Sequence, residues 1–283
     1  MKPKTLKQAL ATKLSASEAD ELVRSYDVLG SIAIIDVPEV LEKKEKMIAE
    51  ALLETHKQVK TVLKKLEKHE GEFRTQKLLL VAGDDTRETL VRESGCSFLL
   101  DVEQVYFSGR LSTERLRLAE LVQPGEQVLV MFSGAAPYVV VLAKHSLADR
   151  IVGVEKNPAG HRYGVENLRL NKVKHAELFN RDCSDLSFLN DRFDRIIMPA
   201  PFNAVDFLVQ ALSVAKDFCH VHCYCFAAEH ELPLVIDTIE QRSSQAGFKA
   251  YGFNAVKAGQ HAPYAYRWCI DFLVEKRAQQ LHP

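Results

Sequence analysis

The second half of the sequence contains three successive apolar stretches. A glycine follows the first, and an acidic residue follows each of the other two. They are Gly134 after residues 127–132, Glu155 after residues 150–154, and Asp182 after residues 176–180. At the carboxyl end of a parallel strand, an acid such as Glu155 can accept from both ribose hydroxyls of an adenosine. A carboxylate at Asp182 could accept from an exocyclic amine such as that of adenine. Each residue alone also suits an ordinary turn, but together they predict a nucleotide-type cofactor site.

Residues 219–225 form a second group of side chains that could bind a metal. Cysteines alternate there with histidines and a tyrosine, namely Cys219, Cys223 and Cys225 with His220, His222 and Tyr224. Cysteine and histidine are the common ligands of zinc. Side chains alternate between the two faces of a strand, so the cysteines would share one face and the histidines the other. Ligands on opposite faces cannot complete a tetrahedron, and we expect no metal.

Composition restricts the class of protein. The 283 residues are 47% hydrophobic, enough for two domains with sizeable cores. The formal net charge of −1 lacks the basic excess of many nucleic-acid binders. An RNA contact would therefore be local, and the candidates are the lysines of residues 59–68 and Arg74, Arg110, Arg115 and Arg117.

The sequence shows no signal that would direct the protein out of the cytoplasm. No stretch approaches the roughly 18 to 20 apolar residues of a membrane span, and the N-terminus lacks the apolar run of a secretory signal. The six cysteines have no disulfide-like spacing. We expect a cytoplasmic protein with reduced cysteines and no membrane contact.

The first part of the chain predicts a small α+β domain over residues 26–108, preceded by a lead-in over residues 1–25. Ser15 and Glu18 form a capping-box pattern in the lead-in. The expected elements of the small domain are strands within residues 26–37, 59–66, 77–82, 89–93 and 98–106 and a helix over residues 40–52.

The pattern from residue 109 to residue 283 predicts a Rossmann-like α/β domain. A helix capped by Ser112 or Thr113 ends at Leu121. Strands are expected at residues 127–132, 150–154, 176–180, 195–198, 220–226 and 268–275, and helices at residues 138–143, 160–171, 203–215 and 232–246. Strands that alternate with helices at these intervals are typical of a doubly wound, mostly parallel sheet.

Four motifs occur in one order along most of the chain. They are residues 30–35 (GSIAII), 71–75 (GEFRT), 105–115 (VYFSGRLSTER) and 167–172 (NLRLNK). In residue types, order and spacing, residues 26–276 resemble the archaeal and eukaryotic tRNA (guanine-37-N1) methyltransferases. The resemblance implies a class I methyltransferase domain that binds S-adenosylmethionine, tRNA as the partner, and methyl transfer to N1 of a guanosine beside the anticodon.

The same resemblance assigns roles to individual residues. It implies that Glu114 is the general base that removes the N1 proton, and that Arg110 and Arg74 hold the guanine edge and offset the charge that develops on O6. The residues implied on the cofactor side are Arg115, Phe132, Gly134, Glu155, Asp182, Cys183 and Pro199. By position alone, Glu114 would equally be the third residue of a capping box or an acid that interacts with the helix dipole.

Three positions depart from the family's pattern. Residues 199–201 read Pro-Ala-Pro where the family has Asn-Leu-Pro, Val130 replaces an acidic residue, and Ala136 replaces a glycine. The methyl group of Ala136 is expected to crowd the methionine moiety. The likeness also begins at the family's second domain, so the domain that grips the outer corner of tRNA is expected to be missing.

Three functions remain open from the sequence. Intact Arg110 and Glu114 favour a tRNA methyltransferase. The altered loops at Ala136 and Pro199 would suit the related wybutosine-pathway enzyme, which transfers the aminocarboxypropyl group of the same cofactor. A non-catalytic RNA-binding subunit would retain the fold without the chemistry, and the changes at Val130, Ala136 and Pro199 favour that reading.

Overall fold

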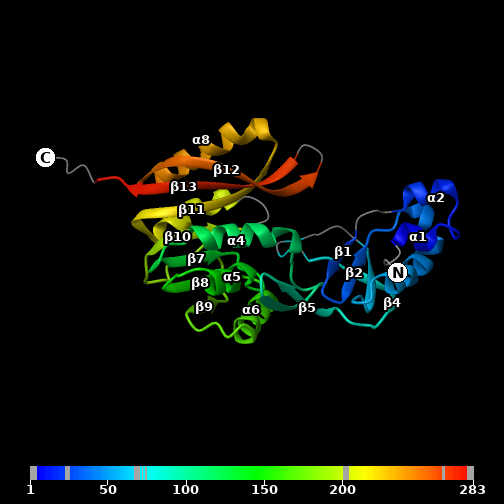
Figure 1. Ribbon diagram of the computed structural model, residues 1–283. Helices are drawn as coiled ribbons and strands as arrows, with labels where there is room; N and C mark the ends of the chain where they lie inside the picture. The colour runs from blue at the N-terminus through cyan, green and yellow to red at the C-terminus, as the bar shows by residue number, and fades with distance from the viewer. Residues whose placement is uncertain are drawn as a thin grey trace. The chain divides into compact units, whose positions relative to one another are not determined.

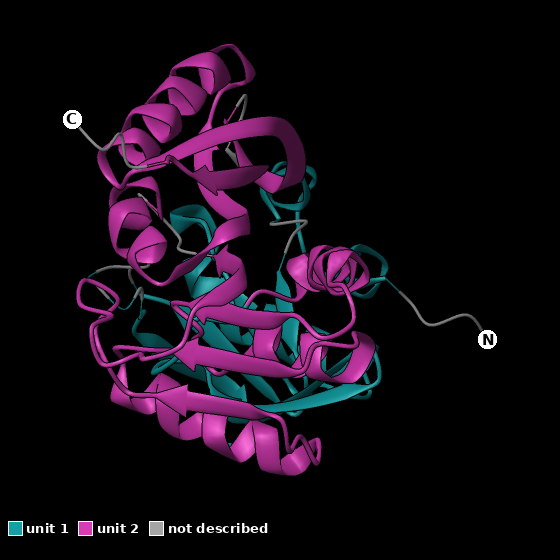
Figure 2. Cartoon of the chain, turned by 90° about the vertical axis from the view of Figure 1, so that its left-hand side faces the viewer, with its two compact units in different colours: residues 1–107 teal, residues 108–283 magenta. Residues whose placement is uncertain are grey.

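The chain divides into two compact units, residues 1–107 and residues 108–283 (Figure 2). The computed structural model describes residues 5–22, 26–66, 71, 73, 75–199, 204–262 and 265–278. Arg74, Ala200 and Pro201, which the sequence interpretation singled out, lie outside the described residues.

Two short helices open the N-terminal unit. Helix α1 (Leu6–Leu10) and helix α2 (Ala16–Glu21) each begin with a capping box, and the one at Ser15 was predicted. Leu6 and Leu10 are buried in one apolar cluster with residues of α3 (Glu45–Thr55). Residues 6–22 therefore contribute to the core of this unit.

The N-terminal unit contains a four-stranded sheet and a separate hairpin. The sheet has the order β1 (Asp27–Leu29), β2 (Ile32–Ile35), β3 (Thr61–Lys65) and β4 (Leu78–Gly83). The 3-10 helix η1 (Glu39–Lys44) and α3 connect the parallel strands β2 and β3. The hairpin consists of β5 (Glu88–Glu93) and β6 (Cys96–Asp101).

Two expected strands of this unit differ from the structure. Residues 26–37 form two antiparallel strands, because Gly30 turns the chain with φ +55°. A Cβ atom at Gly30 would lie 2.4 Å from the carbonyl oxygen of Leu90, so only glycine fits there. The strand expected over residues 98–106 ends at Asp101, whose carboxylate accepts hydrogen bonds from the backbone of Glu103 and Gln104 and forms a turn.

The C-terminal unit is built on a seven-stranded sheet within the described residues. Its order is β12 (Phe248–Ala262), β13 (Ala265–Lys276), β11 (Ala215–Ala227), β10 (Phe193–Met198), β7 (Gln127–Met131), β8 (Arg150–Val154) and β9 (Ala176–Phe179). The strands from β11 to β9 are parallel, and β13 is antiparallel to both of its neighbours. The predicted Rossmann-like, mostly parallel sheet is confirmed.

Helices flank this sheet (Figure 1). They are η2 (Gly109–Leu111), α4 (Ser112–Leu121), α5 (Pro137–His145), α6 (Pro158–Leu170), η3 (Ala204–Phe207), α7 (Leu208–Ser213), η4 (Glu229–Glu231) and α8 (Leu232–Gln245). Figure 1 shows α8 along β12, with which it is in contact. Among the described residues, no helix has the length and apolar character needed to cross a membrane.

Two expectations for the C-terminal unit were wrong, and one strand was missed. Leu111, not Ser112 or Thr113, is the N-cap of α4, and no side chain caps that helix. The helix expected over residues 203–215 ends at Ser213, and β11 already begins at Ala215. Strand β12 was not predicted, because its pairing with β13 shifts register between Tyr251 and Asn254 and again near Gly259, which interrupts the alternation of side chains.

The topology locates the ligand edge of the sheet. Strand β7 is central, with β8 on one side and β10 on the other. The chain runs from β7 to β8 and β9, then returns past β7 to β10. This reversal is a topological switch point, where open α/β sheets bind ligands at the carboxyl ends of their strands. Residues 132–136 follow β7 at this edge.

Candidate active site

The loop between β7 and α5 adopts an unusual backbone. Phe132, Gly134 and Ala136 all have left-handed conformations, with φ of 54°, 56° and 61°. A Cβ atom at Gly134 would meet no atom within 4 Å, so the loop is open on that side. The alternating backbone is suited to a close approach by a ligand, since no side chain at Gly134 stands in the way.

Helix α6 holds the other side of this loop. A Cβ atom at Gly164 would lie 3.3 Å from the Cβ of Ala136 and 2.8 Å from Leu178, so glycine permits the close packing. One turn further on, the buried amide of Asn167 donates to the carbonyl of Ala135 at 2.9 Å. The motif residue Asn167 thus fixes the loop, a role that sequence reasoning did not assign.

This packing also corrects the expectation for Ala136. Ala136 is fully buried, and its methyl group faces Gly164 of α6. It therefore fills the space between loop and helix and does not line the open side at Gly134, contrary to the expected crowding of a methionine moiety.

Glu155 at the end of β8 lies against the same loop. Its Oε2 atom accepts from the backbone N–H of Gly134 and its Oε1 atom from that of Asn157, both at 2.6 Å. Burial raises the pKa of Glu155, and the backbone hydrogen bonds oppose that effect. A carboxylate oxygen has two lone pairs. The backbone N–H of Lys156 also donates to this carboxylate, so one of its about four acceptor positions stays available for a ribose hydroxyl.

Asp182 and Cys183 follow β9. Asp182 forms a half-exposed ion pair with Lys156 at 2.7 Å and accepts from the backbone N–H of Ser184 at 2.8 Å. The Lys156 hydrogen bond lowers the pKa of Asp182, with the Ser184 backbone contributing next. Cys183 is buried, and burial raises the pKa of its thiol to about 12. This thiol is a packing group and not a nucleophile.

Glu114 lies in the first turn of α4 and is 6% exposed. Arg117 donates from Nε to Oε2 at 2.7 Å and from Nη2 to Oε1 at 2.8 Å. The hydroxyl of Tyr224 donates to Oε1 at 2.6 Å. None of these contacts is a cap, so the capping-box alternative for Glu114 was wrong.

Arg117 extends the contacts of Glu114 to the C-terminal strands. Its Nη1 atom donates to Oδ2 of Asp271 at 2.7 Å. The Nδ1 atom of His222 lies 2.6 Å from Oδ1 of Asp271, and Nη1 of Arg195 lies 2.7 Å from Nε2 of the same ring. Because a guanidinium only donates, Nε2 accepts, and Nδ1 carries the ring proton and donates to Asp271. Burial lowers the pKa of His222, consistent with a neutral ring.

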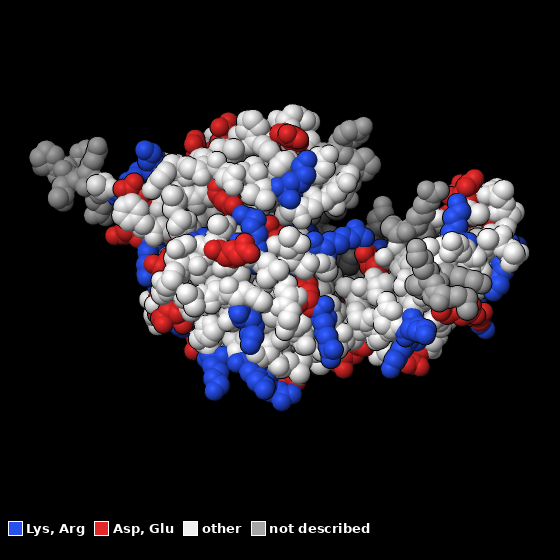
Figure 3. All heavy atoms as spheres, viewed as in Figure 1, with Lys and Arg blue, Asp and Glu red and all other residues white. Residues whose placement is uncertain are grey.

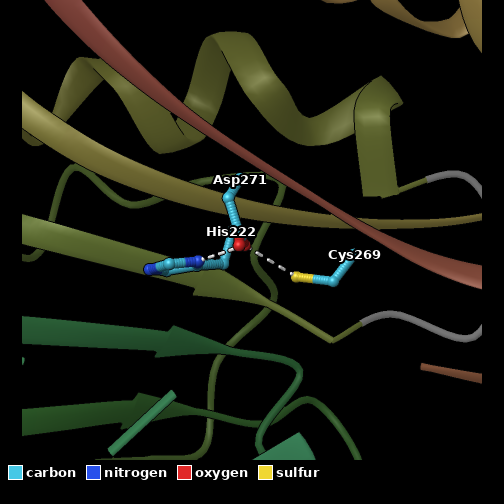
Figure 4. Close-up of side chains that lie close together, drawn as sticks. All are labelled: His222, Cys269 and Asp271. Carbon is cyan, nitrogen blue, oxygen red and sulfur yellow. Dashed lines mark hydrogen bonds and ion pairs between the residues drawn. The ribbon is translucent and has the colours of Figure 1, made fainter. Parts of the chain in front are cut away.

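Figure 4 shows Asp271 between the ring of His222 and the thiol of Cys269. Ligand atoms of these three residues lie within 4.8 Å of one another, which is close enough for a metal. Hydrogen bonds already engage both ring nitrogens of His222 and both carboxylate oxygens of Asp271. The arrangement is therefore explained by hydrogen bonding, without a metal ligand set.

The predicted alternation of side chains along β11 is confirmed. Cys219 and Cys223 belong to the large apolar core of the C-terminal unit, and Cys225 packs against that core. His222 and Tyr224 make the polar contacts described above, on the opposite face.

The remaining candidate residues lie in different environments. Arg110 is exposed on η2. Arg115 is only 1% exposed, donates to the carbonyl of Ser108 at 2.9 Å, and lies over the ring of Tyr138 at 5.5 Å. The ring of Phe132 packs edge-on against Phe207. Pro199 is half-buried directly after β10.

Two tyrosines link Glu114 to the cofactor loop. Tyr138 lies in the first turn of α5, two residues after Ala136. Its hydroxyl donates to that of Tyr224 at 3.3 Å, and Tyr224 in turn donates to Glu114. The candidate base and the candidate cofactor loop are thus joined through neighbouring side chains.

Sequence reasoning missed the partners of Glu114. Arg117 was a candidate RNA contact, yet it is an internal ion-pair residue whose side chain is 24% exposed. The i,i+3 spacing of Glu114 and Arg117 was a usable signal. Nothing local in the sequence indicates Tyr224 or Asp271, which are 110 and 154 residues away from their partners.

The distribution of charged side chains on the surface is consistent with the near-neutral net charge. On the face shown in Figure 3, acidic and basic side chains are interspersed over the described residues of each unit. This distribution is consistent with the expectation that any contact with RNA depends on local cations.

Comparison with protein families identifies the chain. Residues 89–250 match the TRM5/TYW2 methyltransferase domain, and residues 6–86 match the TYW2 N-terminal domain. The chain belongs to the TRM5/TYW2 family. The second match includes residues 6–22, which the sequence alone assigned to a lead-in. The predicted family, fold class and dependence on S-adenosylmethionine are confirmed at this level, and the non-catalytic alternative loses its support.

Two relatives in this family illustrate its two activities. The chain is 38% identical to the tRNA (guanine(37)-N(1))-methyltransferase Trm5b of Pyrococcus abyssi, over 89% of this chain and 76% of that protein. It is 30% identical to the tRNA(Phe) (4-demethylwyosine(37)-C(7)) aminocarboxypropyltransferase of Pyrococcus horikoshii, over 98% of this chain and all of that protein.

Solved structures agree with this assignment. The crystal structure of Pyrococcus abyssi Trm5b matches with a TM-score of 0.84 and 36% identity, over 93% of this chain and 78% of that one. The structure of Pyrococcus horikoshii TYW2 in complex with MeSAdo matches with a TM-score of 0.82 and 27% identity, over 98% of this chain and all of that one.

Proposed function

We propose that this chain transfers a methyl group from S-adenosylmethionine to N1 of guanosine 37 in tRNA, with Glu114 as the general base. The observation that carries the proposal is the environment of Glu114. It is a buried carboxylate, held by Arg117 and Tyr224, and joined through Tyr224 and Tyr138 to the loop at Gly134. The 38% identity to a guanine-37 N1-methyltransferase supports the same assignment.

The proposed reaction needs a proton acceptor. The lone pair of the substrate N1 becomes available for methylation once its proton moves to the Glu114 carboxylate. Bound S-adenosylmethionine supplies the methyl group. As the proton leaves N1, negative charge develops on the guanine O6. Arg110, exposed one turn before Glu114, would offset this charge and hold the guanine edge.

The residues of the loop fit the cofactor. Glu155 keeps one acceptor position for a ribose hydroxyl beside its three backbone donors, and the backbone at Gly134 is open to a ligand. Asp182 would serve the adenine amine only in competition with Lys156. A cytoplasmic location would suit an enzyme that acts on tRNA.

One observation favours a second function. The N-terminal unit matches the TYW2 N-terminal domain, and the chain covers the whole of an aminocarboxypropyltransferase but 76% of Trm5b. By this reading the enzyme would transfer the aminocarboxypropyl group of the same cofactor to C7 of 4-demethylwyosine 37.

The two functions differ in the bond to sulfur that breaks, so labelled cofactor separates them. S-adenosylmethionine would be supplied with the label either in the methyl group or in the aminocarboxypropyl chain. The acceptors would be tRNA with guanosine 37, the same tRNA with adenosine 37 as control, and tRNA carrying 4-demethylwyosine. We expect methyl label on the guanosine 37 substrate alone. Aminocarboxypropyl label on the 4-demethylwyosine substrate would overturn the proposal in favour of the second function.

A further inference from the structure

The hydrogen bonds of Glu114 distinguish its two oxygens. An ionised carboxylate offers about four acceptor positions, two on each oxygen. Arg117 Nη2 and the Tyr224 hydroxyl occupy both positions of Oε1, whereas Arg117 Nε occupies one position of Oε2. Among the described residues, one acceptor position of the carboxylate therefore stays open, and it belongs to Oε2.

We propose that Tyr224 and Arg117 are positioning residues that saturate Oε1 of Glu114 and so make Oε2 the atom that accepts the substrate proton. This inference rests on the proposed role of Glu114 as general base. It adds two residues to the reaction, neither of which touches the substrate, and it assigns the proton transfer to one atom.

Two of the residues that hold Glu114 in place, directly or through Arg117, lie on the paired strands β11 and β13. Strands β11 and β13 pair so that His222 lies opposite Asp271 and Tyr224 opposite Cys269. Tyr224 reaches Glu114 directly, and Asp271 reaches it through Arg117. Because the ladder fixes the spacing of the two contacts, the carboxylate is held at two separate points and cannot rotate freely.

The directions of these hydrogen bonds follow from the chemistry of the groups. Burial raises the pKa of Tyr224, so its hydroxyl keeps the proton that it donates to Glu114. Burial opposes the charge of Arg117, but the hydrogen bonds to Glu114 and Asp271 raise its pKa overall. The other ionisable groups that face this cluster are Arg115, Tyr138, Cys269 and His222.

A measurable consequence follows from the loss of one donor. A hydrogen bond to an ionised carboxylate stabilises the charged form relative to the protonated form. Without the Tyr224 hydroxyl, the ionised carboxylate of Glu114 would lose one of its hydrogen bonds, and Oε1 would compete with Oε2 for the substrate proton. The acid limb of the pH–rate profile should move up by about one pH unit, and the plateau rate should fall by about tenfold.

The test uses the full chain and single-turnover methyl transfer to tRNA with guanosine 37, measured over a range of pH. Tyr224→Phe removes only the hydroxyl that touches Glu114. Tyr26→Phe is the control, because it removes a hydroxyl that is hydrogen-bonded to His56 within the N-terminal unit and has no contact with Glu114 or Tyr224. We expect the acid limb to move in Tyr224→Phe and to stay in place in Tyr26→Phe, with equal affinity for S-adenosylmethionine in both.

A purely structural role predicts a different result. Tyr224→Phe would then lower the melting temperature while its pH–rate profile superimposes on that of the wild type, and the positioning proposal would be overturned. If Tyr224→Phe does not fold, Arg117→Lys serves instead. Lysine keeps the positive charge but cannot span both oxygens, so the same displacement of the acid limb is expected and its absence counts against the proposal.

Glu114→Gln, measured in parallel, separates this inference from the proposed function. A wild-type rate in Glu114→Gln would remove the base itself and with it the proposed function. A slow Glu114→Gln together with unmoved profiles in Tyr224→Phe and Arg117→Lys would leave the base in place and refute only the selection of Oε2.

Discussion

Glu155→Gln should weaken the binding of S-adenosylmethionine strongly, because of how the carboxylate is held. Both oxygens accept from backbone N–H groups at 2.6 Å, one from Gly134 and one from Asn157. A glutamine amide has only one acceptor oxygen. In either orientation its NH2 group would face a backbone N–H, so one loop contact is lost together with one acceptor for the ribose.

The size of the effect follows from these two losses. A hydrogen bond to a charged group contributes about 1.5–3 kcal/mol. Loss of one ribose contact and partial loss of the loop geometry should together cost about 3 kcal/mol, or about a hundredfold in Kd. The loop contact alone should also lower the free energy of unfolding by about 1.5 kcal/mol.

Isothermal titration with S-adenosylmethionine measures the first effect and denaturant unfolding the second. Glu166→Gln is the matched control, since Glu166 pairs with Arg169 on the exposed surface of α6 and should leave both quantities unchanged. Cofactor affinity of the wild type in Glu155→Gln would refute the assignment of the β7–α5 loop as the binding loop.

Three further predictions concern packing, pH and RNA. Gly164→Ala should lower the affinity for S-adenosylmethionine and reduce the free energy of unfolding by about 1–3 kcal/mol, because the new Cβ would lie 2.8 Å from Leu178. Calorimetric titration and denaturant unfolding measure these two quantities, and wild-type values of both would contradict the packing argument. Burial lowers the pKa of His222, so the unfolded chain binds its proton more readily, and stability should fall as the pH drops below the usual histidine range. His222→Gln should flatten that dependence in unfolding experiments at several pH values, and an unaltered slope would contradict the neutral ring. Binding of tRNA should be weak and strongly salt-dependent, because it relies on local cations; tight binding that ignores salt in filter retention would disagree.

The sequence predicted those parts of the fold that have clear local patterns. Strand β8 begins and ends at the residues expected, because an unbroken apolar run is bounded by polar residues. The loop at Gly134 and the acid at Glu155 were placed at the ends of consecutive strands by the same pattern, and the structure brings them into hydrogen-bond contact. Local patterns therefore sufficed where neighbouring strands follow each other in the chain.

Features that depend on distant partners escaped prediction. The pairing of strand β12 with β13 shifts register near Gly252 and Gly259, so the side chains of β12 do not alternate regularly along the sequence. The contacts of Glu114 arise because β11 and β13 bring Tyr224 and Asp271 to α4, and tertiary structure alone determines that juxtaposition. The position of Glu114 in the first turn of α4 suggested a helix cap, but its carboxylate accepts hydrogen bonds from Arg117 and Tyr224 instead.

Single-turnover methyl transfer by Glu114→Gln to tRNA with guanosine 37 tests the central claim most directly. Glutamine keeps the size of the side chain and one acceptor oxygen but removes the proton acceptor. The chemical step should slow by about two orders of magnitude or more, while the affinity for S-adenosylmethionine stays close to that of the wild type. Equal rates for the wild type and Glu114→Gln would contradict base catalysis by Glu114.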